Sequence, residues 1–231
     1  MSAETAGVAV VIPVHNGTAH LPEAIESALT QGSPPAELIV VDDGSTDGSG
    51  DMARAMGARV VSQEHRGPGA ARNLGVESAQ AELVAFLDAD DRMAPGRLAV
   101  QGAALRADPT LDGVFGLMRR FDDVSGVYGE PERCLLPSAF LMRRGSFRVS
   151  GGFDPLLPAG EFVDYMVRCR EQGRRFHVVD ALVVERRVHA GNLTRDKERL
   201  RVGYLAVARS AVHRHRLAQT TQPPGQTELP G

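Results

Sequence analysis

The stretch Ala85-Phe86-Leu87-Asp88-Ala89-Asp90-Asp91 decides how the rest of the chain is interpreted. Its first residues are apolar, as in a buried strand, and three carboxylates then follow within four residues. Charges at the end of a buried strand are costly unless a cation or a polyhydroxylated ligand binds there. Oxygen ligands of this kind favour Mg²⁺ or Mn²⁺ over Zn²⁺. The alternative is an Asp-rich turn, because Asp is common in turns and at helix N-termini.

Two earlier apolar runs end in polar residues in the same way. The run from Val8 to Val14 leads into His15-Asn16, and the run from Glu37 to Val41 leads into Asp42-Asp43. Both runs are rich in β-branched residues, as parallel strands covered on both faces are. In open α/β sheets, ligands bind at the carboxyl ends of the strands. We therefore expect these polar strand ends to form one crevice rather than unrelated turns.

Helical patterns separate the predicted strands. Apolar residues recur on one helical face between Leu21 and Leu29, and shorter helical patterns follow at Met52 to Met56 and at Ala70 to Val76. A short strand is expected at Arg59 to Val61. Strands that alternate with helices predict an α/β fold with a mostly parallel open sheet flanked by helices.

The second half of the chain is less regular. Its patterns predict helices over Arg97–Arg106 and Glu161–Glu171, strands over Gly113–Met118, Ser138–Met142 and Phe176–Val184, and a terminal helix that begins near Arg195. A disordered tail is expected after this helix, because residues 217–231 are rich in Pro, Gln and Thr.

The composition excludes several classes of protein. The 231 residues carry a net charge of −3, which gives no basic field of the kind that nucleic-acid-binding proteins show. Cys134 and Cys169 supply neither a disulfide framework nor a CxxC metal site, which favours a reducing compartment. The first residues lack the pattern of a signal peptide, and no window has the length of an apolar membrane span. We expect a cytoplasmic protein that does not bind nucleic acid.

Several short stretches, taken in order, resemble the motifs of the family 2 glycosyltransferases of GT-A fold. The resemblance covers roughly residues 8 to 195. The matching stretches are Val11-Ile12-Pro13-Val14-His15-Asn16-Gly17, Ile39-Val40-Val41-Asp42-Asp43-Gly44-Ser45-Thr46-Asp47, Gly69-Ala70-Ala71-Arg72-Asn73, Phe86-Leu87-Asp88-Ala89-Asp90-Asp91, Gly151-Gly152-Phe153-Asp154 and Arg187-Val188-His189. Each is weak alone, but their order and their positions after predicted strands make the combination specific.

The resemblance implies a nucleotide-sugar donor, usually a UDP-sugar, and a divalent ion, Mn²⁺ or Mg²⁺. It implies that residues at the ends of the first strands, together with one arginine, hold the nucleotide: Pro13, His15, Asn16, Asp42, Asp43 and Arg72. Asp88-Ala89-Asp90 resembles the DXD motif, in which Asp90 is the expected direct metal ligand and Asp88 lies nearer the ribose. Asp91 is expected to cap or orient the turn, and His189 to complete the metal site.

The chain departs from the family pattern at the expected general base. Inverting members carry an adjacent Glu-Asp pair at the start of the helix that follows the GGFD turn, and the Asp usually takes the acceptor proton. Here the pair is Glu161-Phe162. We expect Glu161 to be the base, with Asp164, three residues further along the helix, as the second candidate. An acceptor that needs little activation, such as a thiolate, is a further alternative.

Two other functions compete with sugar transfer. Phe162 raises the possibility of a protein that binds a nucleotide-sugar without transferring it. A nucleotidyltransferase is less favoured, because it is expected to carry a Gly-rich phosphate loop with a basic residue after the first strand, where this chain has His15-Asn16-Gly17-Thr18. The acceptor stays open among small molecules, lipid-linked sugars, peptides and proteins.

The resemblance also predicts how the chain is divided. We expect one GT-A domain over residues 1–216, with a nucleotide-binding half (1–110), an acceptor-binding half (111–195) and a terminal helix (196–216), followed by the tail (217–231). Between Arg195 and Arg216 there are seven Lys or Arg residues and two acidic residues. This basic helix face is either solvated or in contact with an anionic lipid surface or acceptor.

Overall fold

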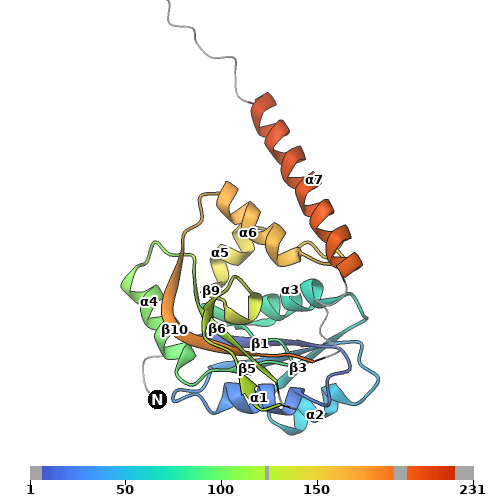
Figure 1. Ribbon diagram of the computed structural model, residues 1–231, viewed down its shortest axis with the longest axis vertical. Coiled ribbons are helices and arrows are strands. Elements are labelled where there is room, and N and C mark those ends of the chain that lie inside the picture. The colour runs from blue at the N-terminus through green and yellow to red at the C-terminus, as the bar shows by residue number, and fades with distance from the viewer. Residues whose placement is uncertain (1–6, 123–124, 190–196, 222–231) are drawn as a thin grey trace, which may run out of the picture.

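The structure of the protein is a computed structural model that describes residues 7–122, 125–189 and 197–221. A mixed β-sheet lies at its centre, with helices against both faces (Figure 1). In spatial order the strands of the main path are β3 (Arg59–Gln63), β2 (Glu37–Asp43), β1 (Val8–Val14), β4 (Leu83–Phe86), β9 (Leu141–Arg143), β6 (Gly113–Asp122), β10 (Phe176–Arg187) and β5 (Arg92–Met93). The short strands β7 (Val127–Tyr128) and β8 (Glu132–Arg133) pair with β6.

The helices divide between the two faces of the sheet. They are α1 (Leu21–Leu29), α2 (Ser49–Ala55), α3 (Pro68–Ser78), α4 (Arg97–Ala107), α5 (Arg144–Val149), α6 (Glu161–Glu171) and α7 (Lys197–Thr221), with a 3-10 turn η1 (Pro137–Ala139). Val8, Val10 and Ile12 of β1 belong to one core cluster with residues of α1, α2 and α4, and Ala9 and Val11 belong to another with residues of α3, α5 and α6. This alternation follows from the two-residue period of a strand.

The strand directions place the polar strand ends together. β1 is parallel to both β2 and β4, and β2 is parallel to β3, so the carboxyl ends of these strands lie at the same edge of the sheet. β9 runs antiparallel between β4 and β6, and β10 runs parallel to β6. The expected α/β fold with an open sheet flanked by helices is confirmed.

Several elements differ from the sequence-based expectation. The strand expected over Ser138–Met142 is split, because η1 occupies its beginning and β9 starts only at Leu141. β10 continues past Val184 to Arg187, with irregular pairing to β6 between Val178 and Val184. The terminal helix runs to Thr221, beyond residue 216 where the tail was expected to begin, and residues 222–231 lie outside the described residues.

Helix α7 packs against the segment that precedes α6 and against α6 itself, and its far end extends away from the body of the molecule (Figure 1). Gly203 permits this close packing, because a Cβ at this position would lie 2.2 Å from the carbonyl oxygen of Ala159. Arg199 donates to the carbonyl of Pro158 at 2.7 Å. Within the described part of the chain, no helix is long and apolar enough to cross a membrane.

Candidate active site

A tight turn after β4 presents the acidic residues of the DXD-like stretch. The N–H of Asp88 donates to Ser138 Oγ at 3.2 Å, and the N–H of Asp91 donates to the carbonyl of Asp88 at 3.1 Å. Asp88 and Asp90 are partly exposed, whereas Asp91 is buried. The turn therefore directs two of its three carboxylates toward the crevice and keeps the third inside the protein.

The guanidinium of Arg72 joins the acidic turn to the start of α6. Its Nη2 donates to Asp88 Oδ1 at 2.6 Å, and its Nη1 donates to Glu161 Oε1 at 2.9 Å. Burial alone would raise the pKa of Asp88, but the charge and hydrogen bond of Arg72 outweigh burial and lower this pKa below its usual value. Arg72 is itself buried, so it holds two carboxylates that are far apart in the sequence at the same place.

Local backbone geometry at the start of α3 makes this bridge possible. Gly67 has a φ of 88°, in the region that favours glycine, and Pro68 opens the helix. A Cβ at Gly69 would lie 3.1 Å from Cγ of Glu161, so a larger residue here would press on the glutamate. The glycines of this loop therefore let α3 approach the start of α6 closely.

Asp90 and His189 face each other across the crevice. Nε2 of His189 lies 2.9 Å from Oδ2 of Asp90, although 99 residues separate them. The two side chains are 32% and 29% exposed, and the ring of His20 lies 5.1 Å from the His189 ring. The described residues hold no cluster of three or more His, Cys, Asp or Glu side chains suited to a metal.

This pair fits a divalent ion whose remaining coordination positions are filled by substrate phosphates and water. An accessible carboxylate oxygen and an imidazole nitrogen in contact are suitable ligands for Mn²⁺ or Mg²⁺, and Mg²⁺ is commonly bound by one or two protein side chains plus phosphates and waters. Asp90 and His189 would hold the ion. Asp88 is instead bonded to Arg72, consistent with a place beside the ion rather than on it.

The Asp43 carboxylate organises the loop between β3 and α3. Its Oδ1 accepts from the N–H of Arg66 at 2.8 Å and from Gln63 Nε2 at 2.6 Å, and its Oδ2 accepts from the N–H of Gly67 at 2.9 Å. Nδ1 of His65 lies 3.0 Å from Oδ2. Asp43 is buried, so its contacts within the protein position this loop.

The neighbouring polar residues form the rim at the ends of β1 and β2. Asn16 has a φ of 53° and its Oδ1 accepts from the N–H of Thr46 at 2.8 Å, which ties the two loops together. The rings of His15 and His65 lie 4.0 Å apart. Asp42 is only partly buried and its Oδ1 accepts from the N–H of Ser45 at 2.9 Å.

Pro13, which the resemblance assigns to the nucleotide, and Ala89, the middle residue of the DXD-like stretch and a further nucleotide-site candidate, lie at the ends of β1 and β4. Pro13 is buried in β1 opposite Val41, and Ala89 is partly buried against the core. Neither side chain carries a hydrogen-bonding group, so we assign them to the shape of the crevice.

The three residues considered at the start of α6 occupy different environments. The Glu161 side chain is 14% exposed and reaches Arg72. Phe162 is buried in an aromatic cluster, with its ring 5.9 Å from that of Phe140. Asp164 is also buried, and its two oxygens accept from Arg168 at 2.7 Å and from Arg214 at 3.2 Å. Of the two carboxylates, Glu161 is the one that the structure brings to Arg72 and Asp88.

A pocket of about 200 Å³ opens beside Glu161. Its walls come from the loop before α3, from the loop before α6 and from the first turn of α7, and include His65, Arg66, Leu156, Glu161 and Arg199. The pocket therefore adjoins the candidate base, and at His65 it borders the β1 and β2 loops that were assigned to the nucleotide.

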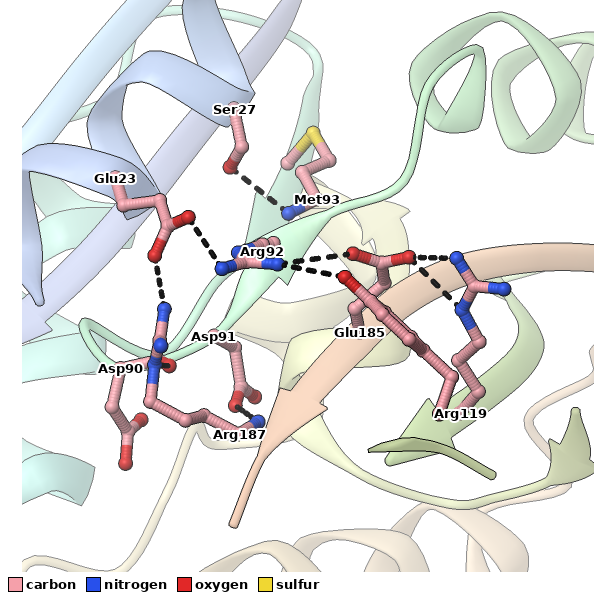
Figure 2. Close-up of polar contacts among 10 residues, drawn as sticks. Glu23, Ser27, Asp90, Asp91, Arg92, Met93, Arg119, Glu185 and Arg187 are labelled. Carbon is pink, nitrogen blue, oxygen red and sulfur yellow. Dashed lines mark hydrogen bonds and ion pairs between the residues drawn. The ribbon is translucent and has the colours of Figure 1, made fainter. Parts of the chain in front are cut away.

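Arg187 fastens the end of β10 to the acidic turn (Figure 2). Its Nε donates to the carbonyl of Asp90 at 2.9 Å, its backbone N–H donates to Asp91 Oδ1 at 3.1 Å, and its Nη2 donates to Glu23 on α1. Glu23 also pairs with Arg92 at 2.6 Å. Partial burial alone would raise the pKa of Glu23, but the hydrogen bonds from the two arginines outweigh it and lower this pKa.

The model of one protein family, described as glycosyl transferase family 2, matches residues 9–154, which is more than half of the chain. The chain belongs to glycosyltransferase family 2. The matched range contains the crevice loops, Arg72 and the acidic turn, and it ends at the GGFD turn.

Curated relatives in this family align with part of the chain. Glycosyltransferase GlyG of Streptococcus pneumoniae is 39% identical over 90 residues, which are 36% of this chain and 30% of GlyG. The succinoglycan biosynthesis protein ExoU of Rhizobium meliloti is 41% identical over 97 residues, which are 39% of this chain and 28% of ExoU. The aligned part is thus less than a third of the length of either relative.

Solved structures confirm the fold of this family member. Staphylococcus aureus TarS residues 1–349, in complex with UDP-GlcNAc, superposes with a TM-score of 0.69 at 22% identity over 82% of this chain and 60% of that chain. The mannosyltransferase PcManGT of Pyrobaculum calidifontis, in complex with GDP-Man and Mn²⁺, gives a TM-score of 0.72 at 20% identity over 90% of this chain and 64% of that chain. The family and the GT-A fold expected from the sequence are both confirmed.

Sequence reasoning missed Glu23 and Ser138 in this family 2 site. Glu23 lies on a helix among ordinary amphipathic residues, and its contact with Arg187 spans 164 residues of sequence. Ser138 was assigned to a strand, and only the η1 turn places its hydroxyl against the acidic turn. Arg187 belongs to a quoted motif, but no local pattern indicated its three contacts.

Proposed function

We propose that this protein transfers a sugar from a UDP-sugar to an acceptor in a single displacement that depends on a divalent ion and inverts the anomeric carbon. One observation carries the proposal: Asp90 lies 2.9 Å from His189, while Arg72 links the neighbouring Asp88 to Glu161. A candidate metal site and a candidate base are thereby joined through one buried arginine. UDP-GlcNAc and GDP-Man with Mn²⁺ in the two neighbouring structures support a nucleotide-sugar donor.

The crevice loops would bind the nucleoside. Asp42 is the accessible carboxylate of its pair, so it is the one placed to accept from the base or the ribose. The rings of His15 and His65, which lie 4.0 Å apart and are tilted by 34°, offer an aromatic surface beside it. Asp43 holds the loop that carries His65 and leads into α3.

The leaving group would lie at the acidic turn. When bound at Asp90 and His189, a divalent ion supplies positive charge beside the diphosphate. The protein's own contribution is to keep Asp88 in place through Arg72 and to keep Asp90 facing His189. A departing diphosphate gains negative charge as the sugar bond breaks, so fixed positive charge at this point stabilises the transition state.

Glu161 would act as the base in the transfer step. Its carboxylate takes the proton of the acceptor O–H while the acceptor oxygen forms a bond to the anomeric carbon, and the bond from that carbon to the diphosphate oxygen breaks with its electron pair. The pocket beside Glu161 is the place where we expect the acceptor to approach. Asp164 is less suited to this role, because two arginines hold both of its oxygens inside the protein.

A donor screen by thermal shift tests the proposed function. UDP-sugars with Mn²⁺ should raise the melting temperature by several degrees, because ligand at 100 times its Kd stabilises the folded state by about 2.7 kcal/mol. GDP- and TDP-sugars should have smaller effects, and chelation of the metal should remove the UDP effect. Tight Mn²⁺-dependent UDP binding without release of UDP from any donor would favour the inactive binding protein, and stabilisation by nucleoside triphosphates alone would favour the nucleotidyltransferase.

We also propose that the outer face of α7 contacts an anionic membrane surface. Val202, Leu205, Arg209, Val212 and Arg216 are three or four residues apart, so they share one helical face, and all of them are exposed. The opposite face is tied to the body by Gly203 and by the ion pairs of Arg214. Apolar residues interspersed with arginines are typical of helices that lie in the interface of anionic bilayers.

Vesicle sedimentation tests this membrane contact. We expect the protein to pellet with vesicles that contain phosphatidylglycerol and to be released by high salt, because each arginine near an anionic surface contributes about 1 kcal/mol. Reversal of both outer-face arginines, Arg209→Glu with Arg216→Glu, should abolish pelleting. The control variant Arg54→Glu with Arg148→Glu changes the net charge equally on α2 and α5 and should retain it. Absence of salt-sensitive pelleting of the unmodified protein would remove the proposal.

A further inference from the structure

The acidic turn is bonded at three points to the end of β10 and to the residues that follow it. The N–H of Arg187 reaches Asp91 at 3.1 Å, its Nε reaches the carbonyl of Asp90 at 2.9 Å, and the His189 ring reaches the Asp90 carboxylate at 2.9 Å. The side chain of Arg187 is 3% exposed. The position of Arg187 therefore determines where the acidic turn lies relative to the His189 ring.

The guanidinium of Arg187 shares the Phe121 ring with a second guanidinium, that of Arg92. Both groups lie over the ring of Phe121, with Arg92 at 4.1 Å and Arg187 at 4.6 Å from its centroid. Two positive charges that share one aromatic ring repel each other. A negative charge bonded to both offsets this repulsion.

Glu23 of α1 supplies that charge, as Figure 2 shows. One of its oxygens lies 2.6 Å from Arg92 and the other accepts from Arg187. Arg92 is held further by Tyr128, whose hydroxyl lies 3.2 Å from Nη1, and it lies 4.0 Å from Glu185. Glu185 is in turn bonded to Arg119 at 2.9 Å. Arg92 is therefore supported on several sides besides Glu23.

The strand that carries Arg92 is itself docked on α1. The N–H of Met93 donates to Ser27 Oγ at 2.9 Å, and Gln31 Nε2 donates to the carbonyl of Ala94 at 3.1 Å. These contacts fix the segment that follows the acidic turn to α1, which carries Glu23, and to Gln31 just beyond its end. Helix α1 thus lies behind the turn as a rigid support.

We propose that Glu23 is a positioning residue for the metal and diphosphate site, acting through Arg187 on the backbone of Asp90. The inference rests on the proposed function of Asp90 and His189 as metal ligands. Glu23 touches neither the ion nor the substrate. Glu23 fixes the guanidinium of Arg187, and Arg187 in turn fixes the backbone of the acidic turn. Asp90 is thereby kept at the distance from His189 at which both side chains can bind one ion. Partners that orient metal ligands in this way commonly change metal affinity 10- to 100-fold when they are removed.

The test measures Mn²⁺ affinity directly. Free Mn²⁺ is followed by electron paramagnetic resonance at saturating UDP, and the melting temperature of each metal-free variant is recorded separately. Glu23→Gln keeps the shape of the side chain and removes its charge. We expect it to raise the Mn²⁺ concentration at half-saturation about tenfold. Arg187→Lys, which loses the forked guanidinium, should do the same.

The double variant shows whether Glu23 acts through Arg187. If it does, Glu23→Gln together with Arg187→Lys should bind Mn²⁺ no more weakly than the weaker single variant. Glu171→Gln is the matched control, since Glu171 is 40% exposed and bonded to Arg214, while Glu23 is 41% exposed and bonded to Arg187. It should leave Mn²⁺ affinity unchanged.

Each outcome decides the inference. A purely structural role for Glu23 predicts a lower melting temperature with unchanged Mn²⁺ affinity, and that result overturns the proposal, as does full additivity in the double variant. If Glu23→Gln does not fold, unchanged Mn²⁺ affinity in Arg187→Lys alone overturns it. Failure of the unmodified protein to bind Mn²⁺ with UDP is a different result, because it removes the proposed function itself.

Discussion

Asp90→Ala should lower the affinity for UDP in the presence of Mn²⁺ by about 100-fold or more, because it removes one of the two side chains that we propose as metal ligands. Without the metal, the residual affinity for UDP should match that of the unmodified protein, since the nucleoside loops are untouched. Isothermal titration with UDP, with and without Mn²⁺, measures both values. His189→Ala should change the Mn²⁺-dependent affinity in the same direction.

The control for this prediction removes a carboxylate of the same type elsewhere. Asp51 on α2 is 89% exposed and pairs only locally with Arg54, so Asp51→Ala should bind UDP and Mn²⁺ as the unmodified protein does. Equal Mn²⁺-dependent affinities for the unmodified protein and Asp90→Ala would show that the acidic turn does not hold the ion. The assignment of the metal site would then be wrong.

Glu161→Gln should greatly lower the rate at which the donor is cleaved, while the affinity for the donor stays nearly unchanged. A general base contributes about 10²- to 10⁴-fold to a rate, so release of UDP from the donor should fall by about that factor. The glutamine oxygen can still accept the hydrogen bond from Arg72, which keeps Asp88 and the nucleotide site in place. With the acceptor unidentified, the probe is slow hydrolysis of the UDP-sugar that gives the largest thermal shift.

Asp164→Asn is the informative comparison at the same helix. It weakens the buried contacts with Arg168 and Arg214, and breaking a buried ion pair costs about 3–5 kcal/mol of folding free energy. We therefore expect a lower melting temperature but an unchanged hydrolysis rate for the folded protein at low temperature. If instead Asp164→Asn abolished hydrolysis and Glu161→Gln left it unchanged, the base would be Asp164.

Two carboxylates that are adjacent in the sequence lie in different environments in the structure. Asp42 and Asp43 were both assigned to the nucleotide, but Asp43 is buried with both oxygens bonded to the loop before α3. Which of two adjacent carboxylates accepts hydrogen bonds from a distant loop depends on the path of that loop in the folded chain. The sequence of β2 carries no information on the path of residues 63–67, so the distinction required the folded chain.

The same reasoning applies to the start of α6. The sequence indicated that Phe162 replaces the expected aspartate, and it left Glu161 and Asp164 as alternatives. The structure separates them, because Arg72 reaches Glu161 whereas Arg168 and Arg214 enclose Asp164. The arginines that make this difference come from α3, from one turn further along α6 and from α7.

The sequence by itself determined the α/β class, the succession of strands and helices in the first half, and the polar ends of β1, β2 and β4. These features follow from local physical chemistry: β-branched runs form buried strands, and a charged strand end needs a ligand or a partner. The family resemblance implied that His189 completes the metal site with Asp90, and the structure places the two side chains 2.9 Å apart. Only the tertiary structure decided that Arg72 bridges Asp88 and Glu161 and that Glu23 supports the turn through Arg187. Each of these contacts joins residues 89 or more positions apart along the chain, except for Arg72 with Asp88. Such contacts are created by strand order and helix packing, which no local pattern encodes.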